Sequence, residues 1–207
     1  PSSDYELVQQ SFDMLALLNG EIDAAQAMIY NEYAQMLEST NPATGLRVTA
    51  DDLSVIDWND EGTAMLQDAL WADGARLGNA DYADITTRFV AASLEGWMHC
   101  RDNSADCVEI VLNNGSSLGA SHQAWQMNEI NGLIWPSPDG AGVMDEGLWA
   151  QTVNVATSQG ILASAPDSGA YTTEYAEAAV EMLKNRGVDT TGKNWRRVDV
   201  TLNPGGE

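Results

Sequence analysis

The chain has 207 residues, of which 44% are hydrophobic, and it carries seven Trp and eight Met. This composition is typical of a globular protein with a sizeable core rather than of a disordered chain. A formal net charge of −22 disfavours binding to nucleic acid or to an anionic membrane, because both depend on Lys and Arg to neutralise phosphate. The acidic residues are spread along the chain, which indicates a solvated surface.

The first third of the sequence mixes helical and extended patterns. Residues 11–19 predict a helix that stops at a glycine, and the apolar run 21–30 predicts a short buried strand. From Asn31 the apolar period becomes helical. A second strand is predicted over 53–58, and the helical period returns over 64–71.

The remainder of the sequence is mostly helical in pattern. Helices are predicted over 82–97, 105–115, 121–135, 145–160 and 173–187, and a last strand over 197–202. Two apolar stripes along 82–97 predict a deeply buried helix. Ser121 is a candidate N-cap, and Lys184 and Gly187 fit the end of a helix. The first 60 or so residues therefore suggest an α/β arrangement and the rest a helical layer.

The sequence offers few groups for catalysis or for metal binding. Cys100 and Cys107 form a C-x6-C pair with no neighbouring metal pattern, and two adjacent helix ends could bring them within disulfide distance. The sequence leaves that pairing open, since it would require an oxidising compartment. His99 and His122 lie at predicted helix ends, where structural hydrogen bonding is the common role. No nucleophile or nucleotide-binding motif is present, so no catalytic residue and no metal ligand is predicted.

The segment Tyr30-Asn31-Glu32 allows two interpretations. It follows a predicted strand and opens a predicted helix, which is where open α/β sheets bind ligands. Glu32 could accept hydrogen bonds from an amino group, and Tyr30 could stack on a flat ring. Alternatively, Asn31 caps the helix and Glu32 complements the helix dipole. The residues alone do not favour either interpretation.

A second polar cluster, Trp58-Asn59-Asp60-Glu61, follows the second predicted strand. Acidic residues before a helix are commonly caps, and that is the more ordinary interpretation. The functional alternative is a cleft or hinge segment between two lobes.

Three long runs carry a resemblance to a known family. They are "RFVAASLEGWMHCRDNSADCVEIVL", "HQAWQMNEINGLIWPSPDGAGVMDEGLWAQTV" and "GAYTTEYAEAAVEMLKNRGVD". Together with "LLNGEIDAAQAMIYNEY", they resemble the solute-binding proteins of ABC transporters that take up thiamine-pyrimidine precursors. That group is related to nitrate-, sulfonate- and taurine-binding proteins and to fungal pyrimidine synthases.

The resemblance implies a type II periplasmic-binding-protein-like fold, a two-lobed α/β architecture, here partial and helix-rich. Residues 1–56 would belong to the second, ligand-cleft lobe, and 57–207 would form a helix-rich return into the first lobe with a C-terminal tail. The match begins inside the second lobe, so the family's N-terminal third is expected to be missing. A face left open in this way would favour self-association.

The function implied is that of an extracytoplasmic or periplasmic component of an ABC importer, working with a membrane permease. It would bind an aminopyrimidine or a related small solute, without a cofactor and without catalysis. A thiamine-pyrimidine synthase-like enzyme and a nitrate-, sulfonate- or taurine-binding protein are the alternatives. Carried over by resemblance, the ligand contacts would be Tyr30, Asn31, Glu32, Trp58, Asn59, Asp60 and Glu61.

Overall fold

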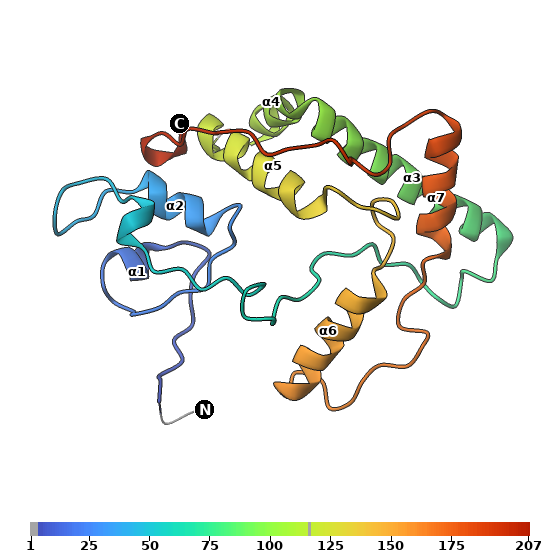
Figure 1. Ribbon diagram of the computed structural model, residues 1–207, viewed down its shortest axis with the longest axis horizontal. Helices are drawn as coiled ribbons and strands as arrows, with labels where there is room; N and C mark the ends of the chain where they lie inside the picture. Colours follow the sequence, from blue (N-terminus) through green and yellow to red (C-terminus); the bar gives the residue numbers. More distant parts are fainter. Residues whose placement is uncertain (1–3, 116) are drawn as a thin grey trace. The chain divides into compact units, whose positions relative to one another are not determined.

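The computed structural model describes residues 4–115 and 117–207. These residues form helices joined by loops and extended segments, as Figure 1 shows. The α-helices are α1 (Leu15–Leu18), α2 (Glu32–Glu38), α3 (Ala80–Asp102), α4 (Ser104–Asn114), α5 (Ala120–Ile134), α6 (Glu146–Ser158) and α7 (Glu174–Asn185), and the 3-10 turns are η1 (Ala50–Asp52) and η2 (Pro204–Gly206). In this described part of the chain, no helix is both long enough and apolar enough to cross a bilayer.

The predicted two-lobed α/β fold of the periplasmic-binding type is wrong for this structure. The described backbone contains no sheet, and its bridge between Thr40 and Arg47 is isolated. The segments 21–30, 53–58 and 197–202, predicted as strands, are therefore not strands. An extended segment becomes a strand only when a neighbouring segment satisfies its N–H and C=O groups, and no described segment does so here.

The chain divides into two compact units. The first unit contains residues 1–54, 100–134 and 195–207, and the second contains residues 55–99 and 135–194. Each unit thus gathers segments that are distant in the sequence. The predicted functional division into 1–56 and 57–207 stays a prediction.

The first unit has a small apolar core around α1 and α2. Met14, Met36 and Val48 are buried there, and Leu17 and Leu53 pack against them. Met36 belongs to the helical period that begins at Asn31, so that part of the sequence pattern is confirmed. The core is small because α1 and α2 are short.

The turn η1 begins with a capping box formed by Thr49 and Asp52. Hydrogen bonds from the Thr49 hydroxyl and from the Thr49 N–H lower the pKa of Asp52 below its usual value of 3.8. Because the pKa of Asp52 is lower in the folded chain, its ionised carboxylate stabilises this turn at pH values above the usual pKa. That support is lost as the pH falls through the lowered pKa.

In the second unit, the segment around Gly140 and Gly142 packs against α3 and α7. A Cβ placed on Gly140 would lie 2.8 Å from Val180 of α7, and one on Gly142 would lie 3.0 Å from Leu94 of α3. Both glycines also have positive φ angles, of 112° and 81°. A larger residue at either position would therefore strain the backbone and crowd a buried side chain.

The prediction that the helix over 82–97 is deeply buried is wrong in part. Val90, Leu94 and Met98 of α3 are buried, but Ile85 is 53% exposed and Phe89 is 61% exposed. The sequence shows that both stripes are apolar. Only contacts with distant segments decide which stripe is covered.

The helix predicted over 64–71 does not form. The carbonyl of Ala64 accepts a hydrogen bond of 2.7 Å from the Gln151 side chain, and the N–H of Leu66 donates to the Thr152 hydroxyl at 2.9 Å. Both partners belong to α6. Side chains of a neighbouring helix therefore satisfy backbone groups that a local helix would otherwise pair.

The predicted end of α7 is confirmed, and α6 begins with a cap that was not predicted, whereas Ser121, the predicted N-cap, lies inside α5 (Ala120–Ile134). The Asp145 side chain caps α6 by accepting a hydrogen bond of 2.9 Å from the Leu148 N–H. Lys184 lies in the last turn of α7, and Gly187 follows with a φ of 79°. The end of α7 is set by residues within one turn, so the sequence pattern is sufficient to find it.

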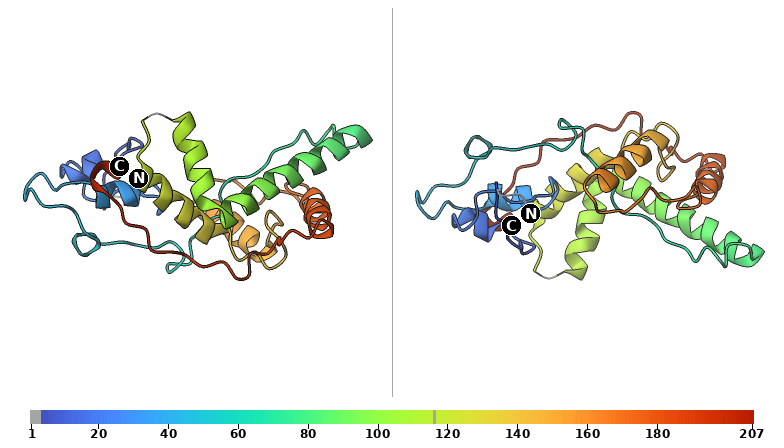
Figure 2. Two further views of the ribbon diagram at one scale, coloured as in Figure 1. Left: turned by 90° about the horizontal axis from the view of Figure 1, so that it is seen from above. Right: turned by 90° about the horizontal axis from the view of Figure 1, so that it is seen from below.

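A disulfide between Cys100 and Cys107 joins the end of α3 to α4. Asn103 is the single residue between the two helices, whose ribbons Figure 2 shows. The pairing that the sequence left open is thus made across a break between two helices.

We expect both thiols to be blocked in the folded chain. Alkylation without reductant should leave the chain mass unchanged, and alkylation after reduction should add two labels. Reduction should also lower the free energy of unfolding by about 2 kcal/mol, the value for closing so short a loop. Two labels on the unreduced, folded chain would contradict this pairing.

Thr190 offers a test of packing in the second unit. Its side chain is buried, and its hydroxyl oxygen has no hydrogen-bond partner among the described residues. Because an unpaired buried hydroxyl is costly, Thr190→Val should raise the free energy of unfolding by about 1 kcal/mol in a denaturant titration. Thr191→Val is the matched control, since the Thr191 hydroxyl bonds to Asp189 at 2.9 Å. A gain from the control and not from Thr190→Val would contradict the argument.

Candidate functional site

The predicted site segment Tyr30-Asn31-Glu32 lies where α2 begins in the first unit. Asn31 is the residue before the helix, and Glu32 is its first residue. The N–H groups of Asn31 and Tyr33 both donate to the Met28 carbonyl, at 3.1 and 3.2 Å, so the chain turns tightly into the helix. A helix does begin here, but the predicted cap by Asn31 is wrong, because its side chain makes no capping hydrogen bond, and the segment follows an irregular turn rather than a strand.

Glu32 has a buried carboxylate at the positive end of this helix. The residue is 8% exposed, and the carboxylate accepts hydrogen bonds from the Met28 N–H at 2.9 Å and from the Asn31 amide at 3.2 Å. An ionised carboxylate has about four acceptor positions, so these two bonds leave capacity for further donors. The position also suits a negative charge because of the helix dipole.

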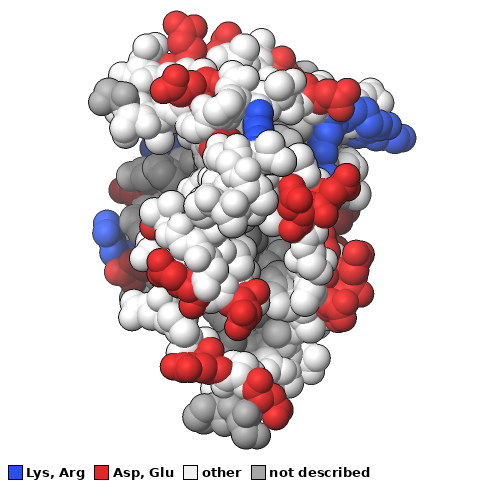
Figure 3. Space-filling model, turned by 90° about the vertical axis from the view of Figure 1, so that its left-hand side faces the viewer, with Lys and Arg blue, Asp and Glu red and all other residues white. Residues whose placement is uncertain are grey.

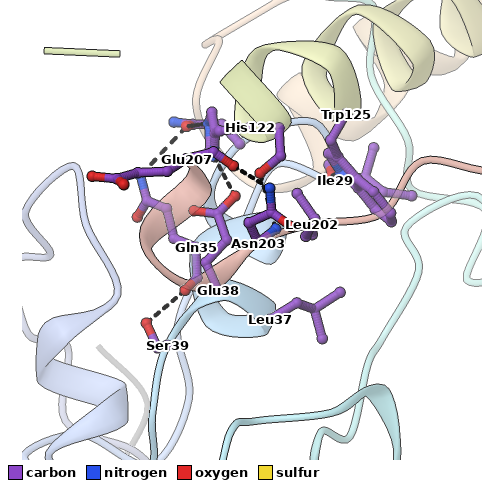
Figure 4. Close-up of polar contacts among 12 residues, drawn as sticks. Ile29, Gln35, Leu37, Glu38, Ser39, His122, Trp125, Leu202, Asn203 and Glu207 are labelled. Carbon is purple, nitrogen blue, oxygen red and sulfur yellow. Dashed lines mark hydrogen bonds and ion pairs between the residues drawn. The ribbon is translucent and has the colours of Figure 1, made fainter. Parts of the chain in front are cut away.

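A histidine from α5 bridges both ends of α2. His122 Nε2 lies 2.9 Å from Asn31 Oδ1, and His122 Nδ1 lies 2.7 Å from Glu38 Oε1. Figure 4 shows His122 above Glu38, with Gln35 and Glu207 nearby. The side chains of His122 and Glu38 are 12% and 8% exposed, so this contact is largely shielded from water.

An aromatic contact forms the next part of the α2–α5 junction. The Trp125 indole N–H donates to the Ile29 carbonyl at 2.9 Å. Its ring centroid lies 6.3 Å from that of Tyr33, with the planes tilted by 39°. The hydrogen bond fixes the indole just beside the turn that carries Tyr30.

The C-terminal segment is held along α5 by side chains. The Asn128 amide both donates to the Val198 carbonyl and accepts from the Val198 N–H, each at 3.0 Å. The Ser121 hydroxyl accepts from the Asn203 N–H at 2.9 Å. Asn128 thus makes the pair of backbone bonds that a neighbouring strand would make, which explains why 197–202 is extended without being a strand.

The other predicted site residues lie in the second unit, where 58–62 forms a turn. The Asn59 N–H donates to the Asp57 side chain at 2.7 Å, and the Gly62 N–H donates to the Asn59 carbonyl at 3.0 Å. Trp58, Asn59, Asp60 and Glu61 are all exposed. The predicted strand-to-helix switch is wrong here, while the ligand role of these residues stays a prediction.

His122 and Glu38 were not predicted as site residues. His122 was expected to have only a structural role at a helix end, and Glu38 was expected to have none. The available signal was the seven-residue spacing of Asn31 and Glu38, which places both side chains on one face of a helix. Among the described residues, no group of three or more His, Cys, Asp or Glu side chains could hold a metal ion.

One face of the molecule shows how its charged side chains are arranged. In the face that Figure 3 shows, the acidic side chains are scattered and the few basic ones are set apart from one another. The α2–α5 junction is therefore distinguished by burial of its carboxylates rather than by a surface patch of charge.

Comparison with known proteins gives no relative. No protein-family model, no curated protein and no solved structure matches this chain.

Asn128→Leu should release the C-terminal segment from α5. Because it leaves the N–H and C=O of Val198 without partners, the free energy of unfolding should fall by about 2 kcal/mol. Hydrogen exchange at Val198 should become faster at the same time. Asn113→Leu, an exposed position on α4, is the control and should change neither quantity. Unchanged exchange at Val198 in Asn128→Leu would contradict the assignment.

Proposed function

We propose that this chain is the solute-binding component of an ABC importer and that its solute is an aminopyrimidine of the thiamine-precursor type. The sequence resemblance given above is the reason to name that class. The proposal concerns the ligand and the residues that bind it, and it does not include the two-lobed α/β fold.

The observation that carries the proposal is the buried carboxylate of Glu32 at the start of α2. It retains acceptor capacity after its bonds to Met28 and Asn31. An aminopyrimidine presents an exocyclic amino group beside a ring nitrogen, and a carboxylate can accept from both when that nitrogen is protonated. Asn31 adds an amide next to the carboxylate, so donors and acceptors are both available.

Aromatic side chains beside Glu32 suit a flat ring. Tyr30 is half-buried two residues before Glu32, and Tyr33 follows it and contacts Trp125. A planar heteroaromatic solute gains from stacking on such rings. A sulfonate or nitrate would instead need cationic or N–H donors, and a carboxylate at the centre of the site would repel it.

The disulfide supports an extracytoplasmic location. Disulfides persist in oxidising compartments and are rare in the cytosol, and Cys100 pairs with Cys107. A binding protein that delivers a solute to a membrane permease works in such a compartment. No step in this role requires a cofactor.

The test is calorimetric titration of the chain with hydroxymethyl- and formamidomethyl-aminopyrimidine, with taurine and nitrate in parallel. We expect heat with a pyrimidine and none with the two anions. Glu32→Gln should weaken the pyrimidine affinity at least tenfold, because it replaces a charged acceptor with a neutral one. Glu21→Gln, an exposed position in the same unit, should keep the affinity.

Two results would overturn the proposal. One is the absence of heat with either pyrimidine. The other is an equal pyrimidine affinity for the chain and for Glu32→Gln, which would remove Glu32 from the site. Conversion of a pyrimidine to a new product, followed by chromatography of the same samples, would favour the synthase-like alternative instead.

A further inference from the structure

His122 holds the two ends of α2 to α5 through groups that can only accept hydrogen bonds from it. Glu38 presents a carboxylate, which when ionised accepts only. Asn31 presents its side-chain oxygen, because its amide nitrogen donates to Glu32 and its oxygen also accepts from Gln35 at 3.4 Å. Both ring nitrogens of His122 therefore face acceptors.

A neutral imidazole cannot satisfy this arrangement. It carries one N–H donor and one bare nitrogen, whereas the imidazolium carries two donors. We propose that His122 is a proton-dependent clasp: its protonated ring joins α5 to both ends of α2, and loss of the proton releases one of the two contacts. Through Asn31 the ring also positions Glu32 for its ligand. This second part of the proposal rests on the function proposed above.

The charged groups that face the ring are carboxylates. Glu38 and Glu32 come from α2, and Glu207 comes from the C-terminal end of η2. On α5 itself, Glu129 is two turns away and pairs with Arg197 at 3.1 Å. The nearby cation Arg47 donates to the carbonyls of Leu37 and Leu202 rather than to these acids.

The turn η2 lies directly over the His122–Glu38 pair. A Cβ on Gly206 would lie 2.9 Å from the His122 Cβ and 3.0 Å from Glu38 Oε2. Gly206 also has a φ of 80°, which glycine adopts without strain. Because this contact leaves no free space, a change in the His122–Glu38 pair reaches the C-terminal turn as well.

The test measures the protonation of both His122 nitrogens by long-range proton–nitrogen NMR. It uses the labelled full chain without solute. Only two histidines are present, so His99→Gln identifies the His122 signals. At pH 6 we expect both His122 nitrogens to be protonated. In Glu38→Gln the pH at which the ring loses its proton should fall by at least half a unit. Glu129→Gln is the matched control, a buried acid of the same unit, and should leave that pH unchanged.

Two observations would overturn the clasp. One is a single neutral tautomer of His122 at pH 6, which corresponds to a reversed Asn31 amide donating to the ring. The other is the same deprotonation pH for the wild-type chain and for Glu38→Gln. The first measurement uses the unaltered chain, so it stays decisive even if Glu38→Gln does not fold.

The positioning part is tested by pyrimidine titration on both sides of the measured deprotonation pH. In the wild-type chain we expect the pyrimidine affinity to be at least threefold lower above the deprotonation pH than below it. In His122→Gln the affinity should be the same at both pH values. Equal affinity at both pH values would overturn the positioning role while leaving pyrimidine binding established. A protonated His122 with no pyrimidine heat would instead overturn the proposed function and leave the clasp established.

Discussion

The constraint on which this structure depends is that extended backbone has to find hydrogen-bond partners without a sheet. Polar side chains of helices supply them in both units. Asn128 of α5 pairs twice with the backbone of Val198, and Gln151 of α6 bonds to the carbonyl of Ala64. These amides therefore hold the extended segments to the helices in place of a neighbouring strand. The amide side chains also have to be placed accurately, because each makes hydrogen bonds to backbone groups that a neighbouring strand would otherwise make.

The same constraint explains why the candidate site lies where it does. The segment before α2 is irregular, and its carbonyl at Ile29 is bonded by Trp125 of α5. Its turn is closed by the Glu32 carboxylate. The acid is buried in this arrangement, because its carboxylate bonds back to the Met28 N–H within the same turn. The burial of this carboxylate thus follows from the need of the turn for a hydrogen-bond acceptor.

Sequence reasoning succeeded where the determining interactions are local. The end of α7 follows from Gly187, which acts within one turn of the helix. It failed for 53–58 and 64–71, whose conformation depends on which distant groups meet their backbone. The start of α2 could be predicted for the same local reason. The His122 contact to Asn31 could not, because the two residues are 91 positions apart and no periodic pattern connects them.

The disulfide between Cys100 and Cys107 has a consequence for how the chain responds to proteases. It closes a small covalent ring around the break at Asn103, between α3 and α4. A protease that cuts one peptide bond inside this ring produces two polypeptides that remain attached to each other. The nicked chain keeps α3 and α4 in one molecule, and only the addition of a reductant separates its parts. Cleavage at the junction between α3 and α4 therefore does not divide the protein.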